Sequence, residues 1–209
     1  MLFQPPRLLR NAHIQSILAS SKLRKPKLLK AASEMIKASR EELLPAGEST
    51  YLHCIISEHQ AVEQNTSRPL VILLHGWEGS AQSSYILSSA TALYNQGYDV
   101  LRLHLRDHGP SHHLNAGLFH AARIGEVIEA VRSINEKYPR KLTYLTGFSL
   151  GGNFALRLAA HARIHQLKLN KVIAISPVVN PTNTMAALDN GSVIYRAYFM
   201  KKWLSLIHI

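Results

Sequence analysis

The fold is decided by one short stretch, Gly147-Phe148-Ser149-Leu150-Gly151, which directly follows the apolar run Leu142–Thr146. The run predicts a β-strand, and the apolar spacing after it predicts a helix over residues 150–164. A strand that turns at once into a helix holds its central residue in a strained conformation, and only small flanking residues let the two elements approach so closely. We therefore expect the two glycines to support a sharp turn that presents the Ser149 hydroxyl at its apex.

On both sides of this turn, short β-rich runs alternate with helical patterns, which is typical of βαβ units and a parallel sheet. The four predicted strands are Leu70–His75, Tyr98–Leu105, Leu142–Thr146 and Lys171–Ser176. Gly97 is placed to end the first intervening helix with a left-handed cap, and Pro139 stops the second. Upstream, two runs flank Pro45-Ala46-Gly47 and predict an antiparallel hairpin. The whole pattern predicts a doubly wound α/β domain with its ligands at the carboxyl ends of the strands.

A second motif, His75-Gly76-Trp77-Glu78-Gly79-Ser80, follows the first strong strand. An acyl-transfer site needs two preorganised N–H donors for the oxyanion, one from the residue after the nucleophile and one from the loop after this strand. We expect the backbone N–H groups of Leu150 and Trp77 to be these donors. His75 and Gly76, with Gly147 and Gly151 at the turn, are expected to support the site.

These motifs resemble the α/β-hydrolase superfamily and, within it, the YheT-like branch, which is related to the eukaryotic abhydrolase-domain esterases. The resemblance runs almost from end to end, and the residues that carry it are Pro5-Pro6-Arg7, Arg10 to Ile17, His75 to Ser80, Gly147 to Asn153, Ser176-Pro177 and Tyr195 to Phe199. The loop from Arg106 to His120 departs from the usual sequence of this branch, because it contains the insertion Asp107-His108-Gly109-Pro110.

The resemblance implies a serine hydrolase that acts on short- to medium-chain carboxylic esters through an acyl-enzyme on Ser149, without a cofactor or metal. It also implies a Ser-Asp-His triad in chain order. Only Pro177–Ile209 follows the last predicted strand, and one βαβ unit takes about 30 residues or more. The acid, the histidine and the C-terminal strands are therefore expected beyond the end of this chain. The final stretch, Leu204–Ile209, resembles a translated sequencing adapter and is expected to be a non-native tail.

The 209 residues fit a single domain, with a basic N-terminal segment over residues 1–40 and an incomplete core over residues 41–203. The formal net charge is +11, and residues 1–40 supply +8 of it through nine Lys or Arg against the lone acid Glu34. The body is nearly balanced, which argues against a nucleic-acid partner. The segment either packs on the domain or contacts an anionic membrane surface. Its part from Lys27 to Arg40 fits a helical face or the lead into a strand.

Histidines in the loop over residues 106–120 are predicted to lie on the surface. The histidines of this loop precede the serine, which is the wrong chain order for the general base of this superfamily; they are His108, His112, His113 and His120. A metal site in this loop lacks a spaced carboxylate or cysteine to complete it. The lone Cys54 makes neither an internal disulfide nor a zinc motif.

Residues Val193 to Trp203 are apolar enough to form a helix that caps the site, although ordinary packing explains them equally well. No secretory signal is visible, which favours a cytoplasmic protein with a small-molecule ester substrate. Two alternatives remain, because fold and turn do not choose the acyl donor. One is an acyltransferase or thioesterase, and the other is an inactive hydrolase-fold fragment or binding protein. The sequence leaves the oligomeric state open.

Overall fold

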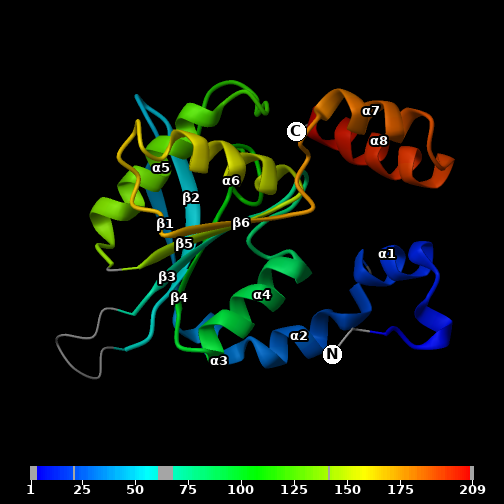
Figure 1. Cartoon of the computed structure of the whole chain (residues 1–209), viewed down its shortest axis with the longest axis horizontal. Coiled ribbons are helices and arrows are strands. Elements are labelled where there is room, and N and C mark those ends of the chain that lie inside the picture. Colours follow the sequence, from blue (N-terminus) through cyan, green and yellow to red (C-terminus); the bar gives the residue numbers. More distant parts are fainter. Residues whose placement is uncertain (1–3, 21, 61–67, 141, 208–209) are drawn as a thin grey trace.

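The computed structural model describes residues 4–20, 22–60, 68–140 and 142–207, which form one six-stranded sheet with helices on both faces (Figure 1). The strand order across the sheet is β1-β2-β4-β3-β5-β6. The strands are β1 (Ser39–Pro45), β2 (Tyr51–Ser57), β3 (Leu70–Leu74), β4 (Asp99–Leu103), β5 (Thr143–Phe148) and β6 (Lys171–Ile175). The last four pair in parallel, while β1 and β2 form an antiparallel hairpin that joins β4. The α/β prediction and the hairpin prediction are confirmed.

The register of β3 and β5 brings the two sequence motifs together. Leu74, the last residue of β3, lies opposite Gly147 near the end of β5. His75 follows β3 directly and Ser149 follows β5 directly, so both motifs stand at the carboxyl edge of the sheet. This edge is where an open parallel sheet binds its ligands.

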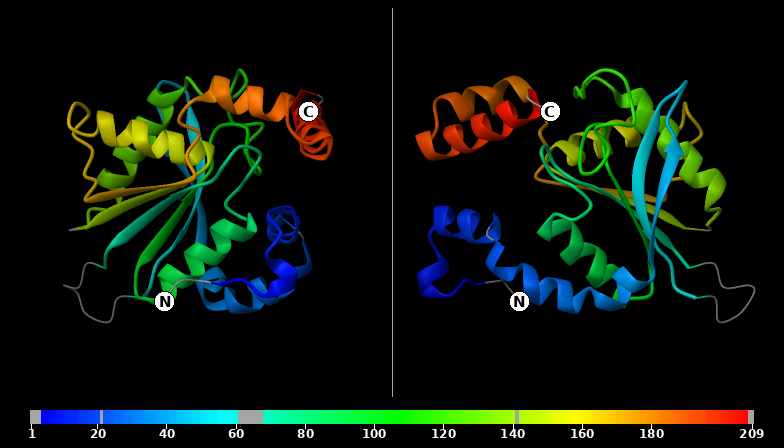
Figure 2. Two further views of the ribbon diagram at one scale, coloured as in Figure 1. Left: turned by 45° about the vertical axis from the view of Figure 1, so that its right-hand side comes forward. Right: turned by 180° about the vertical axis from the view of Figure 1, so that it is seen from behind.

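Helices cover both faces of the sheet, as Figures 1 and 2 show. The longer elements are α1 (Ala12–Ser20), α2 (Lys25–Ala31), α3 (Ser33–Lys37), α4 (Ser84–Asn95), α5 (Ile124–Lys137), α6 (Leu150–His161), α7 (Pro181–Asp189) and α8 (Val193–Ile207), with 3-10 turns at Arg7–Leu9 and Lys22–Arg24. Helices α5 and α6 pack on one face, and α3 and α4 pack on the other. Gly97 has a φ of 88° after α4, as predicted for a left-handed cap.

The core has two layers because alternate residues of a strand point to opposite faces of the sheet. Ile72 and Leu74 pack with residues of α5 and α6, whereas Val71 and Leu73 pack with residues of α4 and with Met35 of α3. The buried α3 side chain anchors the end of the basic segment on the domain. The ambiguous stretch over residues 27–40 therefore holds both helix and the start of β1.

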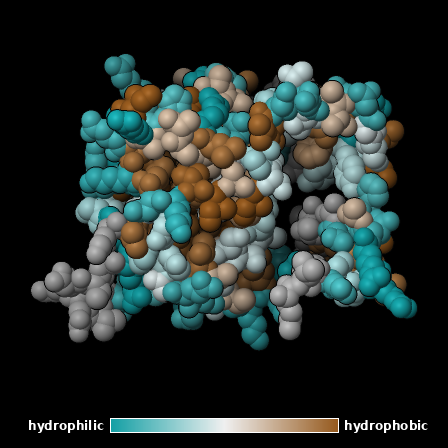
Figure 3. All heavy atoms as spheres, in the orientation of Figure 1, coloured by the Kyte–Doolittle hydropathy of each residue, from teal (hydrophilic) through white to brown (hydrophobic). Residues whose placement is uncertain are grey.

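The first part of the basic segment is far more exposed. Leu8 and Leu23 are 86% and 81% exposed, and contact with a membrane surface stays a prediction. No helix in the described ranges is both long and apolar enough to cross a bilayer. Ile173 and Ile175 of the edge strand β6 are also exposed. Figure 3 shows hydrophobic side chains gathered over the middle of the molecule in the view of Figure 1.

Candidate active site

Ser149 stands at the junction of β5 and α6 with a strained backbone. Its backbone φ of 52° and ψ of −115° lie in a region that residues other than glycine rarely adopt. Three backbone hydrogen bonds hold it there. Its N–H donates to the Ile175 carbonyl at 2.9 Å, and its carbonyl accepts from the N–H groups of Asn153 at 3.0 Å and Val178 at 3.3 Å. The side chain is exposed to solvent at the edge of the sheet. The turn predicted from the sequence is thus present.

The glycines around Ser149 are required by close approach of backbone to backbone. A Cβ at Gly147 would lie 2.1 Å from the Gly151 carbonyl oxygen, and a Cβ at Gly151 would lie 2.3 Å from the His75 carbonyl oxygen. Gly76 faces the serine itself, because a Cβ there would lie 3.2 Å from the Ser149 Cβ. The loop after β3 therefore lies directly against the turn after β5.

The backbone amides of this loop, residues 76–82, are almost all engaged. The acceptors for the amides of residues 76, 78, 79, 80, 81 and 82 are, in order, Tyr85 Oη, His108 Nε2, the Gly76 carbonyl, Ser83 Oγ, His104 Nε2 and Ser80 Oγ. In the ranges that the structure describes, the Trp77 N–H is the exception and donates to no protein group. The amide predicted as an oxyanion donor is thus the free one in an otherwise satisfied loop.

The second predicted donor begins a helix. Leu150 is the first residue of α6, and its N–H likewise has no acceptor among the described residues. Free N–H groups in the first turn and the aligned peptide dipoles make a helix N-terminus favourable for negative charge. An oxyanion beside Ser149 would meet this favourable field.

His75 supports the site from inside the protein. It is fully buried, its Nε2 accepts the Leu105 N–H at 3.1 Å, and its Nδ1 donates to the Gly76 carbonyl at 2.7 Å. Burial lowers the pKa of His75 well below its ordinary value, so the ring is neutral. With both nitrogens occupied by backbone groups, His75 holds the loop and has no free nitrogen for proton transfer.

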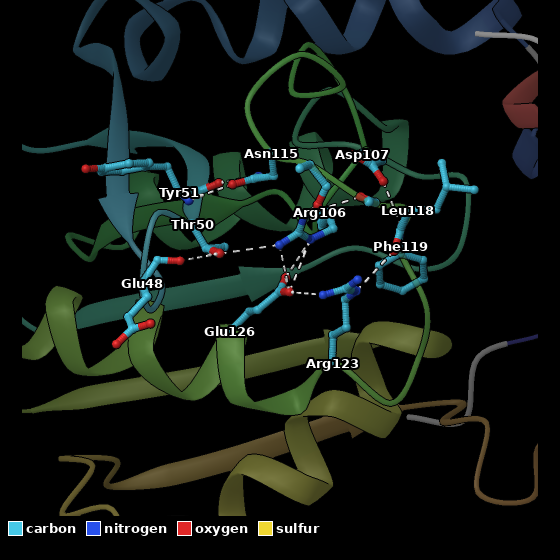
Figure 4. Close-up of polar contacts among 12 residues, drawn as sticks. Glu48, Thr50, Tyr51, Arg106, Asp107, Asn115, Leu118, Phe119, Arg123 and Glu126 are labelled. Carbon is cyan, nitrogen blue, oxygen red and sulfur yellow. Dashed lines mark hydrogen bonds and ion pairs between the residues drawn. The ribbon is translucent and has the colours of Figure 1, made fainter.

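The loop over residues 106–120 is held by an ion-pair cluster, which Figure 4 draws. Arg106 bonds both oxygens of Glu126, with its Nη2 2.8 Å from Oε1, and Arg123 reaches the same carboxylate at 2.9 Å. Arg106 Nη1 also donates to the Ala116 carbonyl at 2.6 Å. Asp107 accepts the Phe119 N–H at 2.7 Å and so fixes the end of the loop near the serine.

The surface prediction for this loop is wrong at one position. His108 is only 3% exposed, and its Nδ1 donates to the Arg106 carbonyl while its Nε2 accepts the Glu78 N–H. His113 and His120 are exposed as expected. The loop has no regular hydrophobic periodicity, so its sequence does not show which of its histidines is buried.

A cleft of about 1000 Å³ opens above Ser149. It is lined mainly by apolar and aromatic residues, among them Trp77, Tyr85, Phe119, Phe148, Met185, Leu188, Tyr198 and Phe199, together with His120 and Lys25. The Trp77 ring stacks on the Phe199 ring of α8 with centroids 5.7 Å apart and planes 7° apart. Helix α8 therefore borders the cleft, and Figure 3 shows the hollow between the C-terminal helices and the N-terminal segment.

Within the described ranges, no three His, Cys, Asp or Glu side chains come together as a metal site. Among the described residues, His120 is the histidine that lines the same cleft as Ser149. The structure also reveals supports that the sequence did not indicate, chiefly Tyr85 and His104. Each binds a loop amide from another element, and no local motif marks such a contact.

The fold and the turn define a class, and comparison with known proteins agrees with it. The sequence model of the alpha/beta hydrolase fold family matches residues 69–205, so the chain belongs to that family. The protein "Putative esterase YheT" of Escherichia coli is 25% identical over 158 residues, which cover 76% of this chain and 43% of that protein. The protein "Putative esterase/lipase" of Haemophilus influenzae is 29% identical over 102 residues, or 49% of this chain and 32% of that protein. The chain thus matches less than half the length of these two relatives.

Solved structures show the same fold. An esterase of Pyrococcus furiosus, Pf2001, superposes with a TM-score of 0.62 at 19% identity, covering 78% of this chain and 60% of that chain. An esterase of Pyrobaculum calidifontis gives a TM-score of 0.55 at 22% identity, covering 78% of this chain and 53% of that chain. At such low identity these likenesses establish the fold.

Proposed function

We propose that this chain carries the nucleophile and oxyanion hole of a serine hydrolase that acts on carboxylic esters. The observation that carries the proposal is the free Trp77 amide beside the strained Ser149, in a loop whose other amides are satisfied. Preorganised donors aimed at developing charge are the largest single contribution to many acyl-transfer reactions. The names of the relatives support ester hydrolysis as the reaction.

In the proposed mechanism, a general base removes the Ser149 proton while Oγ attacks the ester carbonyl carbon. The carbonyl oxygen becomes an oxyanion that accepts hydrogen bonds from the amides of Trp77 and Leu150. Collapse of this intermediate breaks the bond to the alcohol oxygen, which leaves with the proton from the base. Water then attacks the acyl-enzyme by the same route, which releases the acid and restores the serine hydroxyl.

Short- to medium-chain acyl esters suit the cleft, because its lining is mostly apolar. Phe199 and Trp77 provide flat aromatic surface beside the reacting centre. A thioesterase or acyltransferase would use the same serine and donors, so comparison of ester, thioester and alcohol acceptors must accompany any assay. A binding protein without catalysis is the remaining alternative.

We further propose that the general base and its acid partner come from sequence outside these 209 residues. The buried histidines of the described part are poor candidates, since His75 and His108 use both ring nitrogens for backbone groups. His120 lines the cleft and is the internal alternative.

The test is labelling by a fluorophosphonate probe together with hydrolysis of p-nitrophenyl esters of increasing acyl length. The experiment compares two proteins, namely this chain and the longest protein that its gene encodes. The variants Ser149→Ala and His120→Ala are made in each of the two. We expect the longest product to be labelled and active, Ser149→Ala to lose both properties, and His120→Ala to keep them. An inert longest product would refute the proposed function, and loss of activity in His120→Ala would place the base inside this chain.

A further inference from the structure

We propose that His104 is a positioning residue that holds the loop of residues 76–82 so that the Trp77 amide points at the oxyanion. The proposal rests on the proposed function, but its geometry is independent of the reaction. His104 follows β4 directly and is 1% exposed. Its Nε2 accepts the N–H of Ala81 at 2.9 Å, and Ala81 itself is buried.

The hydrogen-bond partners of His104 fix which ring nitrogen carries its proton. An amide can only donate, so Nε2 of His104 must be the acceptor and Nδ1 must carry the proton. That Nδ1 lies 2.9 Å from Nδ1 of His53, which therefore accepts. The proton of His53 is then on Nε2, 3.2 Å from the carboxylate of Glu41. One tautomer of each ring satisfies the whole chain from Glu41 on β1 to the loop.

A second side chain of β4 holds the same loop residue. Arg102 points to the same face of the sheet as His104, since the two are separated by one residue. Its Nη1 lies 3.5 Å from the Ala81 carbonyl, and its Nη2 donates to Ser39 Oγ at 3.0 Å. The N–H and the carbonyl of Ala81 are thus bound by His104, just after β4, and by Arg102, within β4.

Gly109 lets the histidine ring lie where it does. A Cβ at Gly109 would stand 2.4 Å from Nε2 of His104, the atom that accepts the Ala81 N–H. Its φ of 63° is also in the region that favours glycine. The loop after β4 therefore closes over the ring and keeps water from replacing it as the acceptor.

Ala81 and Gly76 act as the two fixed ends of the loop that carries the free amide. Tyr85 and His75 bind the amide and the carbonyl of Gly76, while His104 binds the other end at Ala81. Loss of the His104 acceptor would leave a buried N–H unsatisfied, which is costly enough to shift the loop. The shift would misplace the Trp77 N–H relative to the oxyanion, an interaction made fully only in the transition state.

Kinetic variants of the longest gene product test this role. We expect His104→Leu to lower kcat for a p-nitrophenyl ester by about 10-fold or more with KM within about twofold. His104→Gln supplies an amide oxygen that can accept the Ala81 N–H, so it should recover most of the lost rate. His113→Leu, an exposed histidine of the neighbouring loop, is the matched control and should keep the parent kcat. A folded His104→Leu variant with unchanged kcat, or a Gln variant no better than Leu, would overturn the proposal.

Nuclear magnetic resonance of ¹⁵N-histidine-labelled protein tests the geometry without relying on activity. We expect His104 to be protonated at Nδ1 and His53 at Nε2 at pH 7.5. The opposite tautomer at His104 would overturn the proposal even if the enzyme is active. If these tautomers are found and the protein does not react with fluorophosphonate, the hydrogen-bond chain stands while the proposed serine hydrolase function fails.

Discussion

The two walls of the cleft are built in opposite ways. On one side, the loop over residues 76–82 is held by side chains of β4, of the loop after it and of α4, and within the described ranges all its amides except that of Trp77 have protein partners. On the other side, α7 contains no buried residue, and Met185 and Tyr198 are 54% and 48% exposed. Few buried contacts mark the segments of a protein that open most readily. The wall formed by this loop and the turn at Ser149, the fixed wall, thus holds its backbone in place, whereas the opposite, open wall presents an apolar surface with little packing behind it.

The largest effect on stability should come from adding one methyl group to the fixed wall at Gly151, in the first turn of α6. A Cβ at Gly151 would meet the carbonyl oxygens of His75 and Leu74 at 2.3 and 2.6 Å, and backbone atoms on both sides cannot move aside cheaply. We expect Gly151→Ala to lower the free energy of unfolding by at least about 3 kcal/mol, measured by urea denaturation.

Gly125 provides the matched control, because a Cβ there meets nothing within 4 Å. It lies in the first turn of α5, where alanine is the better helix former, so Gly125→Ala should stabilise the protein by up to about 1 kcal/mol. Equal stabilities for the two alanine variants would contradict the claim that the fixed wall is built on backbone contact.

The second largest effect should come from lowering the pH, which should reduce the free energy of unfolding through the buried histidines behind the fixed wall. Burial lowers the pKa of His104 to about 3 and that of His75 well below its usual value, whereas both rings titrate near 6.5 in the unfolded chain. Below pH 6.5 the unfolded state therefore binds more protons than the folded state. The stabilisation is complete above pH 6.5 and falls by up to about 1.4 kcal/mol per pH unit for each ring as the pH drops below 6.5, and for His104 this loss continues to a pH of about 3.

Urea denaturation at pH 7.5, 6.5 and 5.5 measures this slope. His104→Gln removes one of the two rings whose pKa is lowered, and it should flatten the slope between pH 6.5 and 5.5, while His113→Gln should leave the slope unchanged. A parent protein whose stability is flat over this interval would show that the two rings are not neutral and buried.

The smallest effect is expected on the open wall. Met185→Ala in α7 removes a side chain that is half exposed, so the free energy of unfolding should change by no more than about 0.5 kcal/mol. Phe154→Ala in α6 removes a fully buried ring of the core and should cost about 3–5 kcal/mol in the same urea experiment. A large effect at Met185 would mean that α7 contributes to the folded core.

The parts of the site that the sequence predicted are those with a local physical signature. Gly147 and Gly151 mark the turn at Ser149 because only residues without Cβ fit there, and the run before them reads as a buried strand. The supports of the loop have no such signature. His104 reaches it from the loop after β4 and Tyr85 from α4, and nothing in the spacing distinguishes a histidine that binds an amide from one that faces solvent. Such contacts depend on how the strands are ordered in space, which periodicity does not encode.

Trp77 carries two separate properties on one residue. Among the described residues its amide has no acceptor, while its ring stacks on Phe199 and lines the cleft. Every amino acid except proline has the same backbone N–H, so the donor survives almost any exchange of the side chain. Position 77 is therefore evolvable: the shape of the cleft can be altered there, by natural selection or by protein engineering, while the proposed oxyanion donor is retained.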